Sequence, residues 1–536
     1  MATVEAGWSE LCKYSLIKPS DNRMDGIKDL DFSTKESQIT EKSLKLRDYG
    51  TVIEDVKAGR LQLSCLDALV DEVKLWLREG GMNLFDRMMS FHVLGHALNT
   101  KRCLTSSPEK ADYNSPLVWE EVFCYRSVMR LASEVSQRRI IALYPAAIMT
   151  RYQADVHLGA LYDHFGRFQE AQYLWLQAGY LNKKDYMWQF NIGFSLASTH
   201  SYYEKRTEPL VLAHAKRLLK PFLEKPETTN SAKVIYNQIK DWETPDLALD
   251  KDINYEGSEE GRYNKWVNDN WLRLNSYNDI NPYSLMSQED SLYFNAVFSP
   301  KDDAGFGYRM FSLLNEIKQE YVSARYMLYR YFTSSGSSHF SDKNVWLADN
   351  VDYSNYSFYI EVAKSAFRAL YSILDKIAYS LNEYLGIGLN PNSVSFKDIW
   401  YSDKKKRTIR TEITRLESNY SLAGLLFIRN DIYGVDEHFL QNESTIRLKA
   451  VRNAMEHRSI AIVDDGVFDE NGLLLKISRV DFEEIAMSLI RTVRQAIFCL
   501  VNMVNHIEYD KKKSIKAAGQ MIIPQKISVV PDDDKV

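Results

Sequence analysis

Residues 155–178 read DVHLGALYDHFGRFQEAQYLWLQA, and residues 188–200 read WQFNIGFSLASTH. Both stretches place apolar residues at the three- and four-residue steps of an α-helix. The matching positions are Leu158, Gly159 and Tyr162 in the first stretch and Ile192, Gly193 and Leu196 in the second. The two glycines, Gly159 and Gly193, stand 34 positions apart. This spacing predicts that the first half of the chain is built from repeated helix pairs.

A period of 34 residues is that of the tetratricopeptide repeat, and Gly166, Phe168 and Ala171 also suit its pattern. In such a repeat a glycine lies where two helices of one unit touch, and an alanine lies where the next helix crosses. An earlier Leu-Gly pair ending at Gly95 fits a degenerate repeat. We therefore predict a tetratricopeptide-like α-solenoid over residues 51–245. The alternative is a helical bundle without repeats in which the match is fortuitous.

The composition is that of a globular protein, with 45% hydrophobic and 26% charged residues among 536. This length suggests two to four domains at roughly 100–200 residues each. The formal net charge of -5 argues against a protein that coats nucleic acid nonspecifically, although it allows a local basic groove. The five cysteines are scattered and form no CxxC, which fits free thiols in a reducing cytosol. We find no signal peptide and no apolar run long enough to span a membrane, so we expect a cytoplasmic protein.

Glycine and proline are scarce, at 23 and 13, and long helix-period segments dominate, so we predict an all-α fold. The predicted parts are an N-terminal extension (1–50), the repeat domain (51–245), a polar interdomain segment (246–305), a helical bundle (306–510) and a flexible tail (511–536). Within the bundle, a helix should begin near Asn442 or Ser444 and end near Arg458. Residues 460–478 then resemble a small β-hairpin, and Ser478 is a good N-cap for a last long helix.

Residues 451–459, VRNAMEHRS, carry the most informative chemistry. RNA holds its own nucleophile, the 2′-hydroxyl, beside each phosphodiester. Cleavage needs a group that moves protons near neutral pH, which His457 can do, and a cation for the phosphate, which Arg452 provides. Asn453 stands four residues before His457 and could orient its imidazole. One histidine and one arginine are the minimal set of catalytic groups for cleaving RNA without a metal or another cofactor.

The spacing implies that one helix is not enough. At about 100° per residue, Arg452 and His457 point about 140° apart on a regular helix. Two copies facing each other across a two-fold axis would supply both residue types to one cleft. By itself this RxxxxH pattern is weak, because an ordinary solvated helix face often contains it.

The segment from about 306 to 510 resembles the HEPN superfamily, the higher eukaryote and prokaryote nucleotide-binding helical domains. The resemblance rests on RNAMEH (452–457), on LLNEIKQEYVSARYMLY (313–329) and on FRALYSILDKIAYSLNEYL (367–385). Its signature is an arginine, a polar residue and, after a few positions, a histidine on a late helix, which here gives Arg452, Asn453 and His457. The resemblance implies a metal-independent endoribonuclease with its site at a homodimer interface, often a toxin or antiviral effector. Ser459 replaces the tyrosine found in members that an adenylylating antitoxin silences, so that mode of control is not expected.

Further residues are weaker candidates for contact with RNA. Glu320 and Arg325 are polar members of an otherwise apolar helix face and would either reach the cleft or be solvated. A basic run could steer the RNA backbone, or could be only a solvated loop. Its members are Lys404, Lys405, Lys406, Arg407 and Arg410. His92 and His96 have the spacing of two zinc ligands on a helix, but no third ligand is evident, and we interpret them as packing residues with no metal site.

The sequence thus predicts an RNA-cleaving homodimer whose solenoid binds a protein or peptide and controls the nuclease. The alternative is a protein without catalytic activity, in which the repeats bind a peptide and the HEPN part only dimerises or binds a nucleotide.

Overall fold

The computed structural model describes residues 40–105, 115–183, 185–224, 229–247, 253–255, 257–295, 306–334, 338–347, 354–405, 407–416, 418–434, 443–464, 474–519, 530–532 and 535. The described residues are predominantly α-helical with only short strands, which confirms the predicted all-α class. None of the described helices is both long and apolar enough to cross a membrane.

The N-terminal half consists of helices that pack in sequence, each against the next. They are α2 (Glu41–Lys57), α3 (Ser64–Glu79), α4 (Leu84–Thr105), α5 (Pro116–Gln137), α6 (Tyr144–His164), α7 (Phe168–Leu181), α8 (Met187–Thr199), α9 (Glu208–Leu219) and α10 (Thr229–Ile239). Helix α2 begins inside the predicted N-terminal extension, where the Thr40 side chain accepts a hydrogen bond from Ser43 N. Residues 1–39 of that extension lie outside the described residues.

The glycines of the repeat pattern lie at the closest approaches between these helices. A Cβ on Gly159 of α6 would stand 2.6 Å from Trp175 Nε1 of α7, and one on Gly193 of α8 would stand 3.0 Å from Leu218 Cβ of α9. These contacts have the geometry predicted for a helix pair within one repeat. They do not by themselves distinguish tetratricopeptide repeats from other stacked helix pairs, so the repeat type stays a prediction.

The C-terminal half is a second helical bundle with its own core. Its elements are α11 (Glu259–Asp269), α12 (Phe306–Thr333), α13 (Phe358–Tyr384), α14 (Thr411–Thr414), α15 (Tyr420–Tyr433), α16 (Glu443–His457) and α17 (Arg479–Ala517), with strands β1 (Ser354–Asn355), β2 (Tyr401–Asp403), β3 (Thr408–Ile409), β4 (Ser459–Val463) and β5 (Leu474–Ser478). Ser478 caps α17 as predicted, because its Oγ accepts a 3.0 Å hydrogen bond from Asp481 N. Helix α17 continues to Ala517, so the predicted flexible tail begins as helix.

The segment predicted as an interdomain connection is part of this bundle. Val267, Leu272 and Leu292 are fully buried in the same core as α12 and α13. Asp279 also forms a buried ion pair with Arg494 of α17, at 2.6 Å. The described residues 257–295 are therefore a packed layer, and their polar side chains act as internal ion-pair partners.

The predicted β-hairpin is wrong. Strands β4 and β5 pair in parallel, with Ser459 opposite Leu474 and Val463 opposite Ser478, and β1 pairs antiparallel on the other edge of β4. A hairpin would bring the chain straight back along β4. Here ten residues separate β4 from β5, and an extended chain of ten residues is longer than the five-residue strand β4 that it must pass before pairing in parallel.

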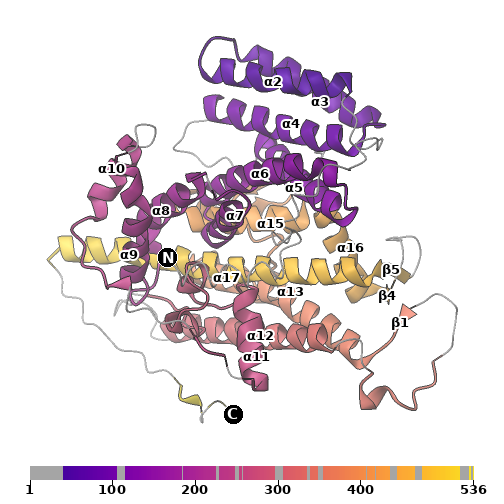
Figure 1. Ribbon diagram of the computed structural model, residues 1–536. Helices are drawn as coiled ribbons and strands as arrows, with labels where there is room; N and C mark the ends of the chain where they lie inside the picture. Colours follow the sequence, from indigo (N-terminus) through magenta and orange to yellow (C-terminus); the bar gives the residue numbers. More distant parts are fainter. Residues whose placement is uncertain are drawn as a thin grey trace.

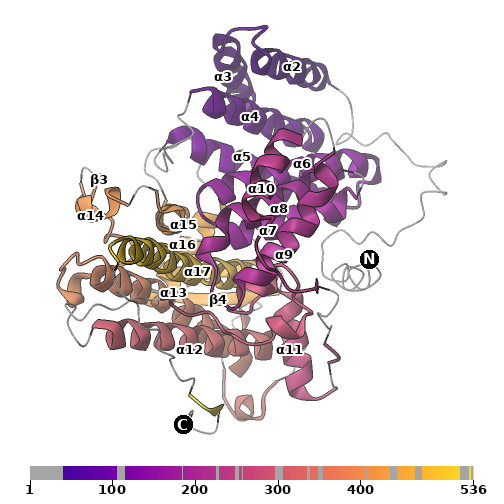
Figure 2. The ribbon, with the colours of Figure 1, turned by 90° about the vertical axis from the view of Figure 1, so that its left-hand side faces the viewer.

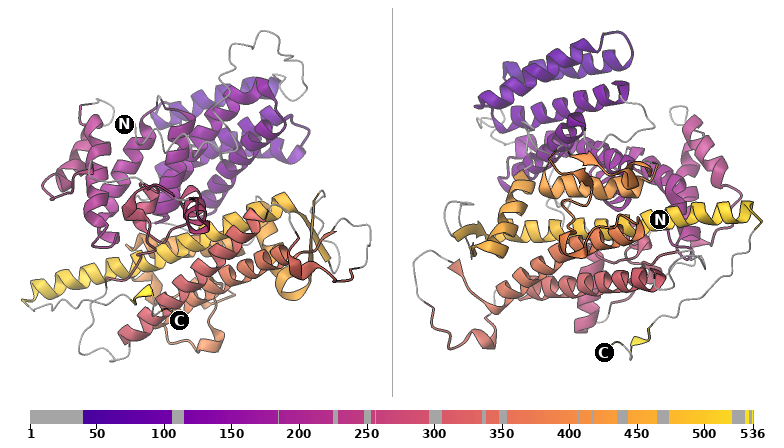
Figure 3. Two further views of the ribbon diagram at one scale, coloured as in Figure 1. Left: turned by 60° about the horizontal axis from the view of Figure 1, so that its bottom comes forward. Right: turned by 180° about the vertical axis from the view of Figure 1, so that it is seen from behind.

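The two halves lie in layers. Figure 1 shows α2–α6 above and α12, α13 and α17 below, with α15 between them, and Figure 2 shows the same order from the side. Helix α17 runs the length of the lower layer in both views of Figure 3. Most of α15 belongs to the lower core, but its Phe427 is buried in the upper one.

Candidate functional site

Helix α16 carries the RNAMEH motif and ends at His457, two residues before β4 begins. Its buried face consists of Ala450, Val451, Ala454 and Met455, which are between 0% and 7% exposed. These are two pairs of neighbouring residues, and the second pair follows the first by four positions. Residues with this spacing form one stripe along an α-helix, and this stripe packs into the core of the bundle. Arg452 and Asn453 lie beside it and are partly exposed.

Arg452 rests against an aromatic side chain of α13. Its guanidinium carbon lies 5.3 Å from the ring centroid of Tyr371, which is 7% exposed. Tyr371 is in turn stacked with Phe367 at 5.7 Å. A guanidinium over an aromatic face is attracted by the ring and held in a defined place while it keeps its charge. The contact therefore fixes the position of the cation that the motif offers to a phosphate.

Helix α16 is also anchored to the start of α17. Arg447 Nη1 donates a 2.6 Å hydrogen bond to Asp481 Oδ1, and the other carboxylate oxygen of Asp481 accepts from Ser478 Oγ at 2.8 Å. The side chains of Arg447 and Asp481 are 31% and 25% exposed, so the ion pair is partly screened by water. Together with the packing on α13, it sets the orientation of the helix that carries the motif.

The side chain of His457 lies outside the described residues, although its backbone closes α16. The predicted hydrogen bond from Asn453 to the imidazole therefore stays a prediction. Because α16 is an α-helix from Glu443 to His457, the angular separation argued from the sequence applies to its backbone positions 452 and 457.

Comparison with known families gives a match over the C-terminal bundle. Residues 303–507 match the family model for LA2681-like HEPN domains. Residues 303–507 are a HEPN domain. Its limits agree to within three residues with those predicted from the sequence, and it contains α12, α13, α15, α16 and most of α17. No curated protein matches the chain and no solved structure matches it, and no family match covers the N-terminal helices.

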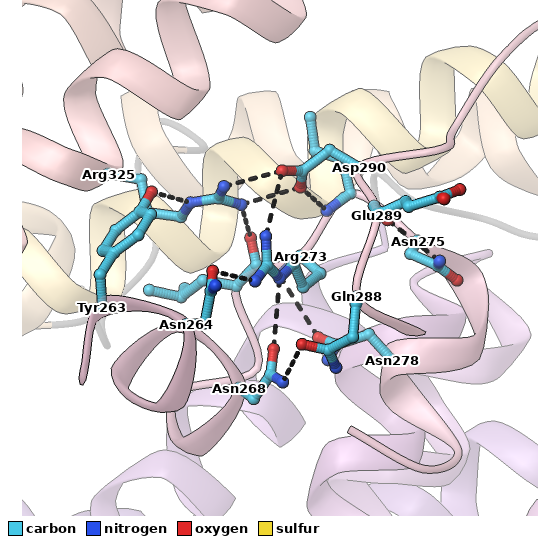
Figure 4. A network of polar contacts seen from close by, with 12 residues as sticks. Tyr263, Asn264, Asn268, Arg273, Asn275, Asn278, Gln288, Glu289, Asp290 and Arg325 are labelled. Atoms are coloured by element: carbon cyan, nitrogen blue, oxygen red, sulfur yellow. Dashed lines mark hydrogen bonds and ion pairs between the residues drawn. The ribbon is translucent and has the colours of Figure 1, made fainter. Parts of the chain in front are cut away.

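Arg325 of the HEPN domain is neither in a cleft nor solvated, contrary to both predicted alternatives. Its side chain is 1% exposed, and its two terminal nitrogens donate to the two carboxylate oxygens of Asp290 at 2.8 and 2.7 Å. Figure 4 shows this pair as part of a polar network that also contains Arg273 and Tyr263. Burial raises the pKa of Asp290, but Arg325 outweighs it and holds the pKa below its usual value. A cation buried among its partners in this way is structural.

Glu320 also has an internal partner. Its Oε1 accepts a 2.8 Å hydrogen bond from Lys376 Nζ, which joins α12 to α13. Its side chain is 32% exposed, so it lies at the surface of the helix pair.

Three members of the basic run, Lys404, Lys405 and Arg407, lie in the turn between β2 and β3, and Arg410 directly follows β3. Lys404 pairs with Asp398 at 2.9 Å, with its side chain 62% exposed, and Lys405 is also exposed. Arg407 adopts a left-handed backbone conformation, at φ 51°, which the turn requires. Arg410 Nε donates to Ile399 O at 2.9 Å, and Lys406 lies outside the described residues. The exposed members stay candidates for a phosphate contact, whereas Arg410 holds the chain beside β3.

Sequence reasoning missed Tyr371, because it reads as one more apolar position on α13. It also missed that His92 and His96 have a histidine neighbour on α6, since the rings of His96 and His157 lie 4.9 Å apart. No group of three or more His, Cys, Asp or Glu side chains among the described residues is arranged to hold a metal ion.

Proposed function

We propose that this protein is an endoribonuclease that cleaves RNA through the 2′-hydroxyl and needs no metal ion. The observation that carries the proposal is that the RNAMEH motif lies on α16 of a HEPN domain, with Arg452 and Asn453 beside the buried stripe. A solvated structural helix would explain the charges, but it would not explain the aromatic support under Arg452.

In this proposal His457 moves protons and Arg452 stabilises charge. The imidazole takes the 2′-hydroxyl proton or protonates the leaving 5′-oxygen, since its ordinary pKa lies near neutral pH. The guanidinium of Arg452 donates to the phosphate oxygens as negative charge builds on the phosphorane. Asn453 orients the imidazole. The products are a 2′,3′-cyclic phosphate and a 5′-hydroxyl.

The active form is a homodimer through the HEPN domain. Positions 452 and 457 face different directions on one α-helix, so a single α16 cannot easily bring Arg452 and His457 to one phosphate. In the dimer the α16 of the second subunit supplies the arginine or histidine that the first cannot. Sedimentation should give a dimer, and specific activity should fall when the protein is diluted below its dimerisation constant. The N-terminal helices bind a protein or peptide and control the nuclease, in keeping with a toxin or an antiviral effector.

The first prediction concerns the two motif residues. Purified full-length protein incubated with total RNA in EDTA should create new 5′-hydroxyl ends and should spare DNA, which lacks the nucleophile. His457→Ala should lower the cleavage rate about 10²–10⁴-fold through loss of proton transfer. Arg452→Ala should lower it about 10²–10³-fold through loss of charge stabilisation.

Two controls separate these effects from general damage. His339→Ala removes a histidine elsewhere in the HEPN domain, and Lys449→Ala removes an exposed cation one turn before Arg452. Both should cleave as wild type does. Expression in a bacterial host adds a second readout, because growth arrest by wild type should be relieved by His457→Ala. A His457→Ala protein that cuts at the wild-type rate would exclude the assignment and favour a non-catalytic interaction protein.

A further inference from the structure

Helix α15 contributes side chains to two hydrophobic cores. Leu425 and Ile428 are buried in the core of the HEPN domain, whereas Phe427 between them is buried in the core of the N-terminal helices. The Phe427 ring is stacked with Trp119 of α5 at 4.3 Å and with Phe165, just after α6, at 5.1 Å. The N-terminal helices therefore hold α15 through an aromatic side chain that is completely removed from water.

One turn further along α15, Asp431 forms a partly buried ionic cluster with the N-terminal helices, in which the side chains of Asp431 and Arg126 are 12% and 22% exposed. Its Oδ2 accepts from Arg126 Nη2 of α5 at 2.7 Å and from Arg167 Nη1, before α7, at 3.0 Å. Arg167 also packs on the Tyr162 ring at 4.2 Å. Burial raises the pKa of Asp431, and the two guanidiniums outweigh this and hold it below its usual value. Loss of the Asp431 carboxylate would leave the Arg126 and Arg167 guanidiniums without the acceptor that they share, so this junction depends on Asp431.

The backbones of the two halves also touch at the start of α15. Gly166, at φ +74°, lies so close that a Cβ there would stand 2.0 Å from Tyr420 O. A Cβ on Gly424 would stand 2.9 Å from Phe165 O. At this distance no side chains lie between the two backbones. A shift of the turn between α6 and α7 must therefore move α15.

Helix α15 packs directly on α16 and on α17. The start of α7 reaches α17 separately, because Glu170 N donates to Gln495 Oε1 at 3.1 Å and Gln495 Nε2 donates to Gln169 Oε1 at 3.0 Å. One packed path therefore leads from α5–α7 through α15 to the helix that carries Arg452.

We propose that α15 is the element through which the N-terminal helices set the position of α16, with Asp431 and Phe427 as positioning residues for the site. This inference rests on the proposed function for its consequence, the control of RNA cleavage. The structural coupling itself can be tested without any cleavage.

The test is hydrogen exchange on the full-length protein. Asp431→Asn and Arg126→Gln each break the cluster, one from α15 and one from α5, which lies in the other half of the chain. Both should speed amide exchange in residues 443–457 roughly tenfold, while α12 and α13 keep wild-type protection. The matched control is Glu383→Gln, which removes a carboxylate from an exposed ion pair with Arg309 in the same domain and should leave α16 unchanged.

Two outcomes would overturn the proposal. One is an Arg126→Gln protein in which faster exchange stops at α5–α7. The other is faster amide exchange throughout the HEPN domain, which would show a general loss of stability and no specific coupling to α16. If wild type cleaves RNA, both variants should also lower kcat and leave KM for RNA unchanged. If wild type does not cleave, the proposed function fails while the exchange result still decides the coupling.

Discussion

Single side chains divide into those that hold the fold and those available for chemistry, and their partners tell them apart. Arg325 and Lys404 look alike in the sequence as cations near the proposed site. Arg325 is enclosed with Asp290, whereas the Lys404 side chain is 62% exposed beside Asp398. Removing one member of a buried pair leaves a desolvated charge, while an exposed pair is replaced by water.

Asp290→Asn should therefore lower the free energy of unfolding by about 3–5 kcal/mol, measured by urea denaturation at pH 7. Lys404→Gln should change it by less than about 1 kcal/mol. If Asp290→Asn and Lys404→Gln both changed the free energy of unfolding by a small and equal amount, the ion pair of Arg325 with Asp290 would not have the structural role assigned to it.

His157 makes a pH-dependent contribution to the free energy of unfolding. Burial lowers its pKa to about 3, with a further contribution from nearby His96. The unfolded chain binds a proton at this histidine below about pH 6.5 and the folded chain does not, so stability is lost as the pH falls from about 6.5 towards 3. The free energy of unfolding of wild type relative to His157→Gln should fall by up to about 1.4 kcal/mol per pH unit in this window. A pH-independent difference between the two proteins would rule this out.

Neighbouring helices approach each other closely where a glycine leaves space for the side chain of the next helix. Gly159 lies under Trp175, whereas a Cβ at Gly50 in α2 would meet no atom within 4 Å. Gly159→Ala should destabilise the protein by about 1–3 kcal/mol, because the added methyl group must displace a buried indole. Gly50→Ala should stabilise it by about 0.5–1 kcal/mol through its better helix propensity. Thermal unfolding of both variants checks the opposite signs, and a stabilising Gly159→Ala would show that α6 and α7 are not in close contact there.

The whole molecule has two hydrophobic cores, and α15 contributes side chains to both. A C-terminal fragment starting at residue 246 keeps the HEPN core but loses the aromatic rings that cover Phe427. This fragment should associate beyond the proposed HEPN dimer on size-exclusion chromatography, and Phe427→Gln should make it more soluble. In the full-length protein the same substitution should cost about 3–5 kcal/mol of unfolding free energy, because it empties a buried aromatic site. A soluble fragment that is no larger than a dimer and that Phe427→Gln does not improve would argue against this junction.

The sequence by itself determined the local features. The helix periods, the glycines at helix contacts, the Ser478 cap and the placement of RNAMEH late on a helix all follow from interactions between residues a few positions apart. The resemblance of the C-terminal segment to the HEPN superfamily also followed, because its helices and motif form a pattern along the chain.

Only the tertiary structure decided what depends on distant partners. Whether β4 pairs with β5 in parallel, whether Arg325 faces water or Asp290, and which core takes Phe427 are set by segments far apart in the sequence. The physical reason is that strand pairing, buried ion pairs and aromatic stacking stabilise the chain only after it has closed long loops, and no local pattern encodes which closure occurs.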